Sequence, residues 1–402
     1  MDPPEGNAMR SYAIESSDGN TVTYQDKKRW LWLLSLINPT VPLIGVIGHL
    51  LSGHELWLLM PVIVMFAVGP LLDLLLGRDE NNPPEEVVSQ LEGDRYYRIL
   101  TYLTVPLHYI VFISCAMWVG TQDLSWWSFI TLTVALGFAD GFAINTGHEL
   151  GHKRTNVETW LAKIVLAIPA YGHFWIEHNR GHHRDVSTPE DPASARMGES
   201  IYKFARREIP GAFHRAWQLE HERLCRKGES VWGSKNEILQ SYFITCVIQI
   251  GLIVAFGWIM LPFLIMHNFL SWWVLTSANY IEHYGLLRMK QENGRYERCQ
   301  PHHSWNANHL VSNLLLFHLQ RHSDHHANPT RRYQSLRHFE DLPQLPIGYY
   351  GMYTLAYLPK FWFMVMDKRL LSLPHINFDL SKINIDPDER ARIEQQYGSF
   401  NE

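Results

Sequence analysis

The sequence has little cysteine and no recognisable nucleotide-binding loop, and both absences exclude classes of protein. No GxGxxG motif is present, so we find no motif through which the chain itself could take hydride from NADH. The net charge of -5 predicts no nucleic-acid footprint, and residues 1–29 lack the apolar core of a cleaved signal peptide. The four cysteines form no CxxC pair, which argues against a disulfide framework or a thiolate metal site and indicates a reducing compartment; they are Cys115, Cys225, Cys246 and Cys299.

Lysine and arginine are absent from three long stretches, residues 30–77, 99–152 and 236–287. Each stretch is roughly 50 residues long, and a membrane crossing needs about 20 apolar residues, so each has room for a helical hairpin. The alternative is three buried hairpins in a large soluble core. Soluble helices carry Lys or Arg on an exposed face, however, which favours the membrane. We therefore predict an all-α integral membrane protein with six transmembrane helices in three hairpins, near 30–52, 55–77, 99–120, 124–146, 237–257 and 260–282.

All 35 basic residues lie on one predicted side of the membrane, before Trp30, within 78–98, between Lys153 and Lys235, or after Leu287. Cytoplasmic connections carry the excess of Lys and Arg, so both termini and the two long polar regions are expected in the cytoplasm. The predicted organisation is a cytoplasmic N-terminal segment 1–29, membrane helices in 30–146, a cytoplasmic region 147–236, membrane helices in 237–282 and a cytoplasmic region 283–402.

Two local features refine this plan. Segment 159–176 is apolar, but Lys163 and Pro169 interrupt it, so we expect it in a helical cap on the cytoplasmic side rather than as a seventh crossing. Gly137 and Gly141 stand four residues apart in the fourth predicted crossing, a spacing that permits close helix packing in lipid.

Histidine is abundant, with 22 residues, and its spacing is more informative than its number. Four clusters lie at the ends of crossings or in the cytoplasmic regions: HELGH at 148–152, HNRGHH at 178–183, the single His283, and HSDHH at 322–326. With six crossings all four fall on the same side of the membrane, where they can meet. Residues three and four apart share one face of a helix, so each cluster is expected to converge on one point: His148 with His152, His178 with His182, and His322 with His325 and His326.

Nine residues are candidate metal ligands: His148, His152, His178, His182, His183, His283, His322, His325 and His326. Octahedral coordination stops at six ligands, so nine imply two metal ions, without assigning a given histidine to either. Neutral imidazole suits Fe, Zn, Cu and Ni, and the spacing alone leaves the metal open. A metal-bound histidine usually donates its second N–H to a carboxylate. Candidates for this outer-sphere role are Glu149, Asp185, Asp191, Glu282 and Asp324, with His318 as an outer-sphere residue or alternative ligand.

The first cluster also permits a different function. HELGH matches the H-E-x-x-H signature of zinc metalloproteases, in which the glutamate is the general base. An intramembrane zinc protease is therefore one alternative, although it would use two of the nine histidines and leave most of the others unexplained. A metal carrier or bis-His haem protein would place its histidines within the crossings, whereas these clusters lie at their ends and in loops.

The order HxxxH, HxxxHH and HxxHH after membrane hairpins resembles the membrane fatty acid desaturase and hydroxylase superfamily. Within it, four stretches resemble bacterial alkane 1-monooxygenases: NTGHELGHK, GHFWIEHNRGHHRDVSTPEDPASARMGESIYKF, LTSANYIEHYGLLR and HSWNANHLVSNLLLFHLQRHSDHH. The resemblance implies a non-haem di-iron enzyme of the bacterial inner membrane that hydroxylates medium-chain n-alkanes terminally. It further implies O2 as co-substrate and rubredoxin as electron donor, itself reduced by a rubredoxin reductase. A fatty-acyl desaturase or hydroxylase of the same superfamily is the second alternative.

Two further sets of residues follow from this function. An alkane offers no polar handle, so a channel between the helices, closed by the histidines, must present the chain end first. Candidate walls of that channel are Met65, Phe66, Phe138, Phe142, Phe263 and Leu270. Basic residues beside the clusters are candidates for docking an acidic electron carrier, namely Lys153, Arg154, Arg180, Arg184, Arg331 and Arg332.

Overall fold

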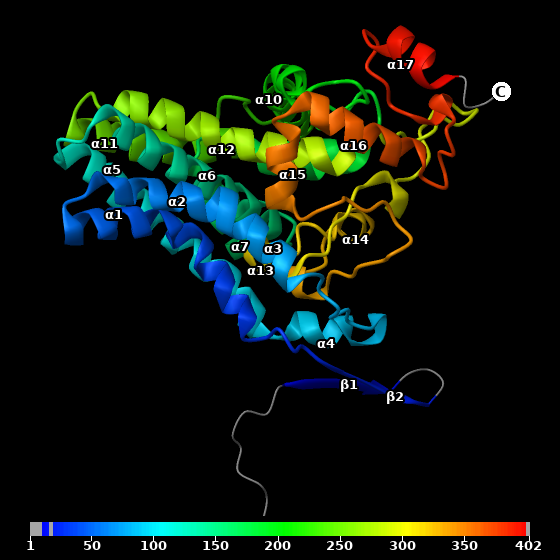
Figure 1. The fold of residues 1–402 in the computed structure, drawn as a ribbon, viewed down its shortest axis with the longest axis horizontal. Coiled ribbons are helices and arrows are strands. Elements are labelled where there is room, and N and C mark those ends of the chain that lie inside the picture. Colours follow the sequence, from blue (N-terminus) through cyan, green and yellow to red (C-terminus); the bar gives the residue numbers. More distant parts are fainter. Residues whose placement is uncertain (1–9, 16–18, 399–402) are drawn as a thin grey trace, which may run out of the picture.

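The computed structural model describes residues 10–15 and 19–398, and these residues are predominantly helical. Their only β-sheet is an antiparallel hairpin of β1 (Ser11–Glu15) and β2 (Thr21–Gln25), which lies beyond α4 (Val88–Gly93) at the edge of the molecule (Figure 1). Of the predicted N-terminal segment 1–29, residues 1–9 and 16–18 lie outside the described part of the chain.

Long helices form an elongated bundle, and shorter ones gather at one end of it (Figure 1). The bundle contains α1 (Val41–Ser52), α2 (Met60–Ile63), α3 (Gly69–Leu76), α5 (Arg95–Thr121), α6 (Trp126–Gly151), α11 (Glu237–Phe256) and α12 (Met260–His283). The other helices are α7 (Asn156–Ala167), α8 (Phe174–Glu177), α9 (His183–Asp185), α10 (Ile201–Arg226), α13 (Leu310–Leu315), α14 (His322–Ala327), α15 (Tyr349–Ala356), α16 (Pro359–Leu371) and α17 (Arg390–Tyr397). Two π-helical turns occupy Val64–Val68 and His178–His182.

Five helical segments are long and apolar enough to cross a membrane by length and composition. They coincide with the first five predicted crossings, and the largest difference is that the fourth continues to Gly151. The sixth predicted crossing forms a helix, α12, but is not among the five, since His267, Asn268 and Glu282 make it more polar. The five segments are Leu31–Ser52, Glu55–Leu76, Arg95–Thr121, Trp126–Gly151 and Glu237–Phe256.

Helices α6 and α12 pack closely because α6 presents glycine to α12. A Cβ atom added at Gly137 would lie 2.6 Å from the Cβ of Leu270, and one at Gly141 would lie 2.4 Å from the Cβ of Val274. The close approach predicted from the glycine spacing is therefore confirmed. Because the contacts advance by four residues on both helices, α6 and α12 run parallel, and the histidines at their C-terminal ends reach the same level.

A buried polar contact, which was not predicted from the sequence, also joins these helices. Asp140 of α6 lies 2.8 Å from Nδ1 of His108 on α5 and 2.9 Å from Nε2 of His267 on α12. All three side chains are buried. An ionisable group inside a membrane bundle is costly unless it is paired, so this contact fixes three helices relative to one another.

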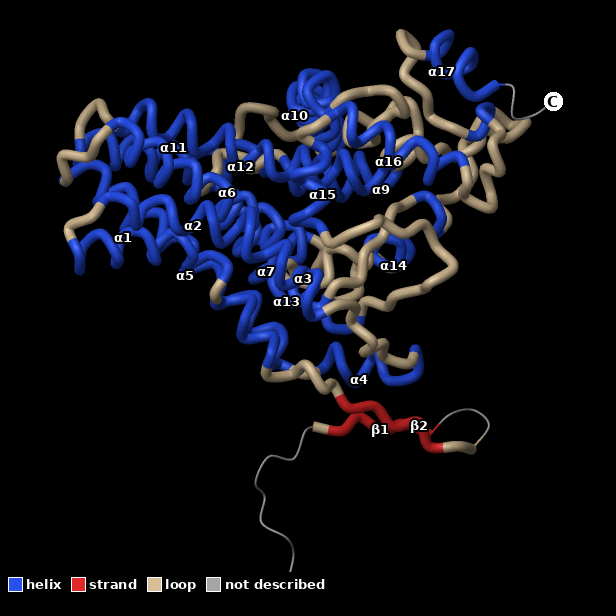
Figure 2. The backbone as a smooth tube through the Cα atoms, in the orientation of Figure 1, coloured by secondary structure: helices blue, strands red, loops and turns tan. Residues whose placement is uncertain are grey.

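The cap forms from the polar regions at the C-terminal ends of α6 and α12. Figure 2 shows loops and short helices gathered around α14 at this end. Segment 159–176 divides into α7 and α8, joined by a turn in which Ala170 has a φ of 53°. Neither helix is among the five apolar segments, and α7 packs against α6 beneath the histidine clusters.

Candidate metal centre

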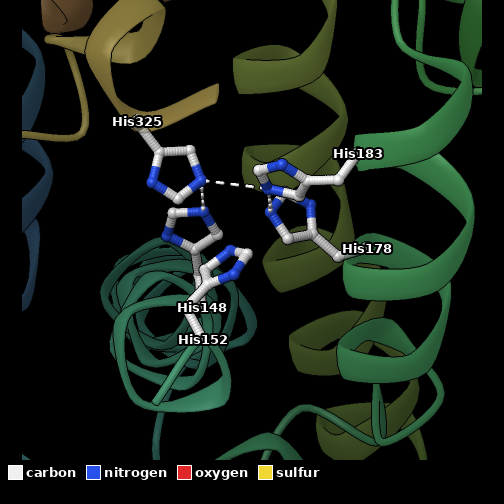
Figure 3. Close-up of side chains that lie close together, drawn as sticks. All are labelled: His148, His152, His178, His183 and His325. Carbon is white, nitrogen blue, oxygen red and sulfur yellow. Dashed lines mark hydrogen bonds between the residues drawn. The ribbon is translucent and has the colours of Figure 1, made fainter. Parts of the chain in front are cut away.

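Nine histidines from four parts of the fold converge in two adjacent groups. Within each group, one ring nitrogen per residue lies within 4.8 Å of those of the other members. Figure 3 shows the first group, in which rings from the end of α6, from the 178–183 segment and from α14 point toward one another. The first group is His148, His152, His178, His183 and His325, and the second is His182, His283, His322 and His326. These are the nine histidines singled out from the sequence.

The second cluster does not converge as its spacing predicted. We expected His178 to share a face with His182, but His178 belongs with His183 and their Nε2 atoms lie 3.1 Å apart. The cause is the π-helical turn His178–His182, whose wider winding brings residues five apart onto one face. His182 consequently points to the other group, and the expected pair was wrong.

Helix α14 likewise divides its histidines between the groups. His322 and His326 share the second group, with Nε2 atoms 3.0 Å apart. His325 turns to the first group, where its Nε2 lies 3.0 Å from that of His148. Successive residues of an α-helix point about 100° apart, so His325 and His326 cannot face one point. The expectation of one common point for all three was therefore wrong, and α14 connects the two groups.

The spacing of the ring nitrogens fits metal coordination. Facing Nε2 atoms lie 3.0 to 3.2 Å apart, as between His178 and His183 or between His283 and His322. Metal–imidazole bonds are about 2.0–2.1 Å long, and two such bonds at right angles place their nitrogens about 3 Å apart. The Nε2 atoms of His152 and His182 are also buried without a hydrogen-bond partner, a cost that a bound cation would remove.

Burial keeps most of these histidines neutral. It lowers the pKa of His178, His183 and His325 well below the usual imidazole value, so their lone pairs are available to a metal at neutral pH. His182 differs, because burial lowers its pKa but the attraction of Asp191 outweighs this and raises it. Asp191 lies 2.9 Å from Nδ1 of His182, which directs the other ring nitrogen into the second group.

Two of the six predicted outer-sphere residues contact a candidate ligand. One is Asp191, and the other is Glu282, whose Oε2 lies 3.4 Å from Nε2 of His322. The hydroxyl of Tyr349 donates to the opposite oxygen of Glu282 at 3.0 Å. The Nδ1 atom of His283 contacts a backbone carbonyl instead of a carboxylate, the oxygen of His303 at 3.3 Å. No sequence pattern reports a backbone contact of this kind.

The other four predicted outer-sphere residues have different partners among the described hydrogen bonds and ion pairs. His318 belongs to neither group, and its Nδ1 lies 2.6 Å from the carbonyl of Tyr333. The carboxylates are neighbours of the ligands in sequence, but they point away from them toward cations. Glu149 pairs with Lys153, Asp185 with Arg184, and Asp324 with Arg331.

A small, mainly apolar cavity of about 30 Å³ borders the histidines. Three of the nine line it, one from α6, one from the π-helical turn and one from α14: His148, His178 and His322. Its apolar lining includes Phe142, Phe174, Val274, Leu275, Leu319 and Tyr353. A small apolar space bordered by ring nitrogens admits an aliphatic group more readily than a polar ligand.

Only Phe142 of the six predicted channel walls lines this cavity. The ring of Phe138 packs edge-on against Phe66, and Met65 and Leu270 pack around the same aromatic cluster. Phe263 belongs to a different cluster and stacks on Phe112. Apolar character alone did not tell a cavity wall from ordinary packing between helices.

The predicted docking residues are mostly neutralised. Lys153 and Arg331 are buried, and each pairs with a carboxylate, while Arg332 lies 2.8 Å from Glu158. Arg180 is half-buried between two glutamates, Glu220 and Glu237. Only Arg154 and Arg184 are exposed, so an extended basic face built from all six residues is not present.

Comparisons with known proteins agree with this geometry. The fatty acid desaturase family model matches residues 124–356, which include all nine histidines. The chain is 56% identical to the alkane 1-monooxygenase of Pseudomonas putida over 374 residues, covering 93% of this chain and 92% of that protein. It is 54% identical to alkane 1-monooxygenase 1 of Alcanivorax borkumensis over 382 residues, covering 95% and 94% of the two chains.

The fold and the histidine groups therefore define a membrane-type protein of the fatty acid desaturase family. Within that family the chain belongs to the alkane 1-monooxygenases, which are oxidoreductases. A more distant relative, 27% identical over 343 residues, is the xylene/toluene monooxygenase hydroxylase component of Pseudomonas putida. The zinc protease alternative is not favoured, because His148 and His152 join three further histidines while Glu149 is paired with Lys153.

Proposed function

We propose that the protein hydroxylates medium-chain n-alkanes to 1-alkanols, using O2 and two electrons from rubredoxin at a di-iron centre. The observation that carries this proposal is the apolar cavity that ends at two adjacent all-histidine groups. The relatives named above support the alkane substrate, because both are alkane monooxygenases rather than enzymes of acyl chains. This favours an alkane hydroxylase over the fatty-acyl desaturase alternative.

Iron is the proposed metal, and the nine histidines would hold two ions, five residues at one and four at the other. When bound, the iron pair supplies the activation of O2 and the two-electron chemistry. Most of the buried histidine rings are neutral and can offer their lone pairs to the metal. Asp191 orients His182, and the apolar lining of the cavity excludes water.

Regioselectivity follows from the shape of the cavity. An n-alkane has no polar group by which it could be oriented, and a reacting carbon must come within about 3 to 3.5 Å of the oxidant. Helices α6 and α12 contribute to the lining of the cavity, and three of the histidines border it. A linear chain that enters end first would therefore present its terminal methyl group to the centre.

The proposed topology has six crossings, with α12 as the sixth, and places both termini and the metal centre in the cytoplasm. Helix α12 supports this proposal because it runs parallel to α6, an apolar segment long enough to span the membrane. Its polar residues face other helices, as His267 does toward Asp140. The proposed location is the inner membrane of a bacterial cell, in keeping with the basic residues on one side.

The proposed electron entry lies beside His183. It is the one candidate ligand that is only half-buried, and Arg184 next to it is exposed. An acidic carrier such as rubredoxin would bring its redox centre closest to the iron there. Of the six basic residues predicted for docking, only Arg154 and Arg184 are exposed near this position.

Metal analysis joined to product analysis tests the proposed function. Purified protein should contain about two Fe per chain, a number taken from the ligand count. Supplied with rubredoxin, its reductase and NADH, it should convert octane to 1-octanol, measured by gas chromatography. A single Zn without Fe would contradict the metal assignment, and substantial 2- or 3-octanol would contradict the proposed end-first cavity.

A further inference from the structure

Helix α14 supplies three of the nine candidate ligands although it has only six residues, His322–Ala327. So short a helix has no stable orientation of its own, because helix nucleation is costly and most helical stability comes from packing. Its histidines must nevertheless point to two different groups. Something outside α14 therefore has to fix the direction in which it leaves the preceding loop.

Arg321 immediately precedes α14 and is fully buried, with 0% of its surface exposed. Its guanidinium donates to four groups, none of them in α14: the carbonyls of Leu336 at 2.6 Å and Asn81 at 3.0 Å, the side chain of Asn308 at 3.2 Å and the carboxylate of Asp79 at 3.1 Å. A planar guanidinium bound on several sides cannot rotate, so the residue before His322 is held in one orientation.

The N-terminal segment completes this arrangement. Lys28 pairs with the same carboxylate of Asp79, and its Nζ lies 2.9 Å from Nε2 of His318. Two buried cations thus meet at one carboxylate. Buried ion pairs contribute little net stability compared with apolar packing, because desolvation offsets the attraction. Their directional bonds do fix geometry, which is what a loop leading into a ligand helix requires.

The backbone of the same loop is strained. Phe317 and His318 have φ values of 53° and 54°, the left-handed region that non-glycine residues rarely adopt. Such conformations persist where surrounding contacts enforce them, and they cluster at functional sites. Here the contacts are those of His318 with the carbonyl of Tyr333 and with Lys28. The strained loop and Arg321 together determine where α14 begins.

We propose that Arg321, held by Asp79, whose carboxylate also pairs with Lys28, is a positioning residue for the metal centre. It fixes the start of α14 so that His322 and His326 reach the second group while His325 reaches the first. The inference rests on the proposed di-iron function. It assigns a role in the metal centre to Lys28, which lies 290 positions before the His318 that it contacts.

Arg321→Lys in the full-length protein tests the proposal, since it keeps the charge and removes the planar fork. We expect iron affinity to fall about 10- to 100-fold, as for other residues that orient metal ligands. The Mössbauer spectrum of the remaining iron should also change. Arg29→Lys is the matched control, because Arg29 pairs with Asp94 at 2.6 Å in the same N-terminal packing and, among the described residues, forms no hydrogen bond or ion pair with α14. Its iron affinity and spectrum should equal those of the unmodified protein.

Lys28→Met and Asp79→Asn keep the test decisive if Arg321→Lys does not fold. With folding verified by thermal unfolding, both should weaken iron binding, Lys28→Met less because Arg321 then retains the carboxylate of Asp79. Unchanged iron affinity and spectrum in the folded variants, with two Fe in the unmodified protein, would overturn the positioning role alone. Absence of two Fe from the unmodified protein would instead overturn the proposed function.

Discussion

His182 differs from the other eight candidate ligands in what lies behind its ring. Asp191 contacts its Nδ1 directly, and Arg215 and Ser194 hold that carboxylate in turn, with Oδ contacts of 2.7 and 2.6 Å. A ring that donates to a fixed carboxylate is locked in one tautomer and one orientation, and its other nitrogen becomes a better ligand. Single residues outside the ligand set therefore determine how well the second group can bind a cation.

Asp191→Asn should weaken metal binding while leaving the fold intact. The amide has nearly the shape of the carboxylate but lacks its charge, so iron affinity should fall about 10- to 100-fold. Competition with a chelator measures it. Asp388→Asn is the control, because Asp388 pairs with Lys203 and contacts no candidate ligand among the described residues. Equal iron affinity in the two variants would show that Asp191 does not orient His182.

Phe142→Ala should lengthen the preferred alkane without changing the position of attack. Phe142 lines the cavity, and its ring contacts Tyr350 with a centroid separation of 5.9 Å, so truncation opens space along α6. The product should remain a primary alcohol, because the histidine end of the cavity is untouched. Gas chromatography with alkanes of increasing length measures both properties.

Phe263→Ala serves as the control for that experiment. It removes the same volume from a buried position, but Phe263 packs against Phe112 and not against the cavity. Both truncations should lower the free energy of unfolding, typically by about 3–5 kcal/mol for a buried phenylalanine. A shift of chain length in Phe263→Ala as well would mean that the preference reflects general loosening rather than the cavity wall.

Among the elements, the π-helical turn and α14 decide how nine histidines become two groups. The turn His178–His182 places His178 with His183 and turns His182 away, and α14 sends His325 and His326 in different directions. Helices α6 and α12 contribute in another way, because their close parallel packing brings His148 and His283 to one level. The ligand set thus depends on irregular elements whose surroundings hold them in place.

Asp140→Ala should destabilise the bundle strongly. Removing one partner of a buried charged contact leaves the others unpaired, here His108 and His267, and such changes cost about 3–5 kcal/mol. Thermal unfolding in detergent should show a clearly lower midpoint. Asp123→Ala, in the exposed connection before α6, should leave the midpoint unchanged. An equally small effect of both variants would show that the buried contact contributes nothing to stability.

Across the whole molecule, the metal centre combines segments from most of the chain. The candidate ligands extend from His148 to His326, and the network behind α14 reaches back to Lys28. The bundle supplies a rigid base and the apolar cavity, while the cap supplies most of the histidines. His183, the half-buried candidate ligand, is where the two groups come nearest to the surface.

Replacing Arg154 and Arg184 together by Glu should raise the apparent KM for rubredoxin and weaken its salt dependence. Charges at the rim of an interface act mainly on association, and salt screens them. Stopped-flow reduction at several ionic strengths measures the effect. Replacing Arg390 and Arg392 together by Glu on the distant α17 is the control, with the same charge change at another exposed site. Unchanged kinetics in the double variant would exclude this face as the docking site.

The sequence by itself determined the apolar segments, the identity of the nine histidines and the family. Residues 30–77, 99–152 and 236–287 lack Lys and Arg because lipid-facing helices cannot carry them, and that pattern is visible without a fold. The prediction of two metal ions came from counting ligands, and the close packing of α6 followed from the spacing of Gly137 and Gly141. Such properties depend on composition and on neighbours along one helix.

Only the tertiary structure decided which atoms meet. His178 and His183 fall in the same group because of a π-helical turn, and the periodicity of the side chains does not predict such a turn. Glu149 turned to Lys153 and Asp191 to His182, although both carboxylates lie close to histidines in the sequence. The choice depends on which cation or imidazole the packing of distant helices brings within hydrogen-bond reach. The same holds for the cavity wall at Phe142 and for the contact of Asp140 with His108 and His267, because these surfaces form only when several helices pack together.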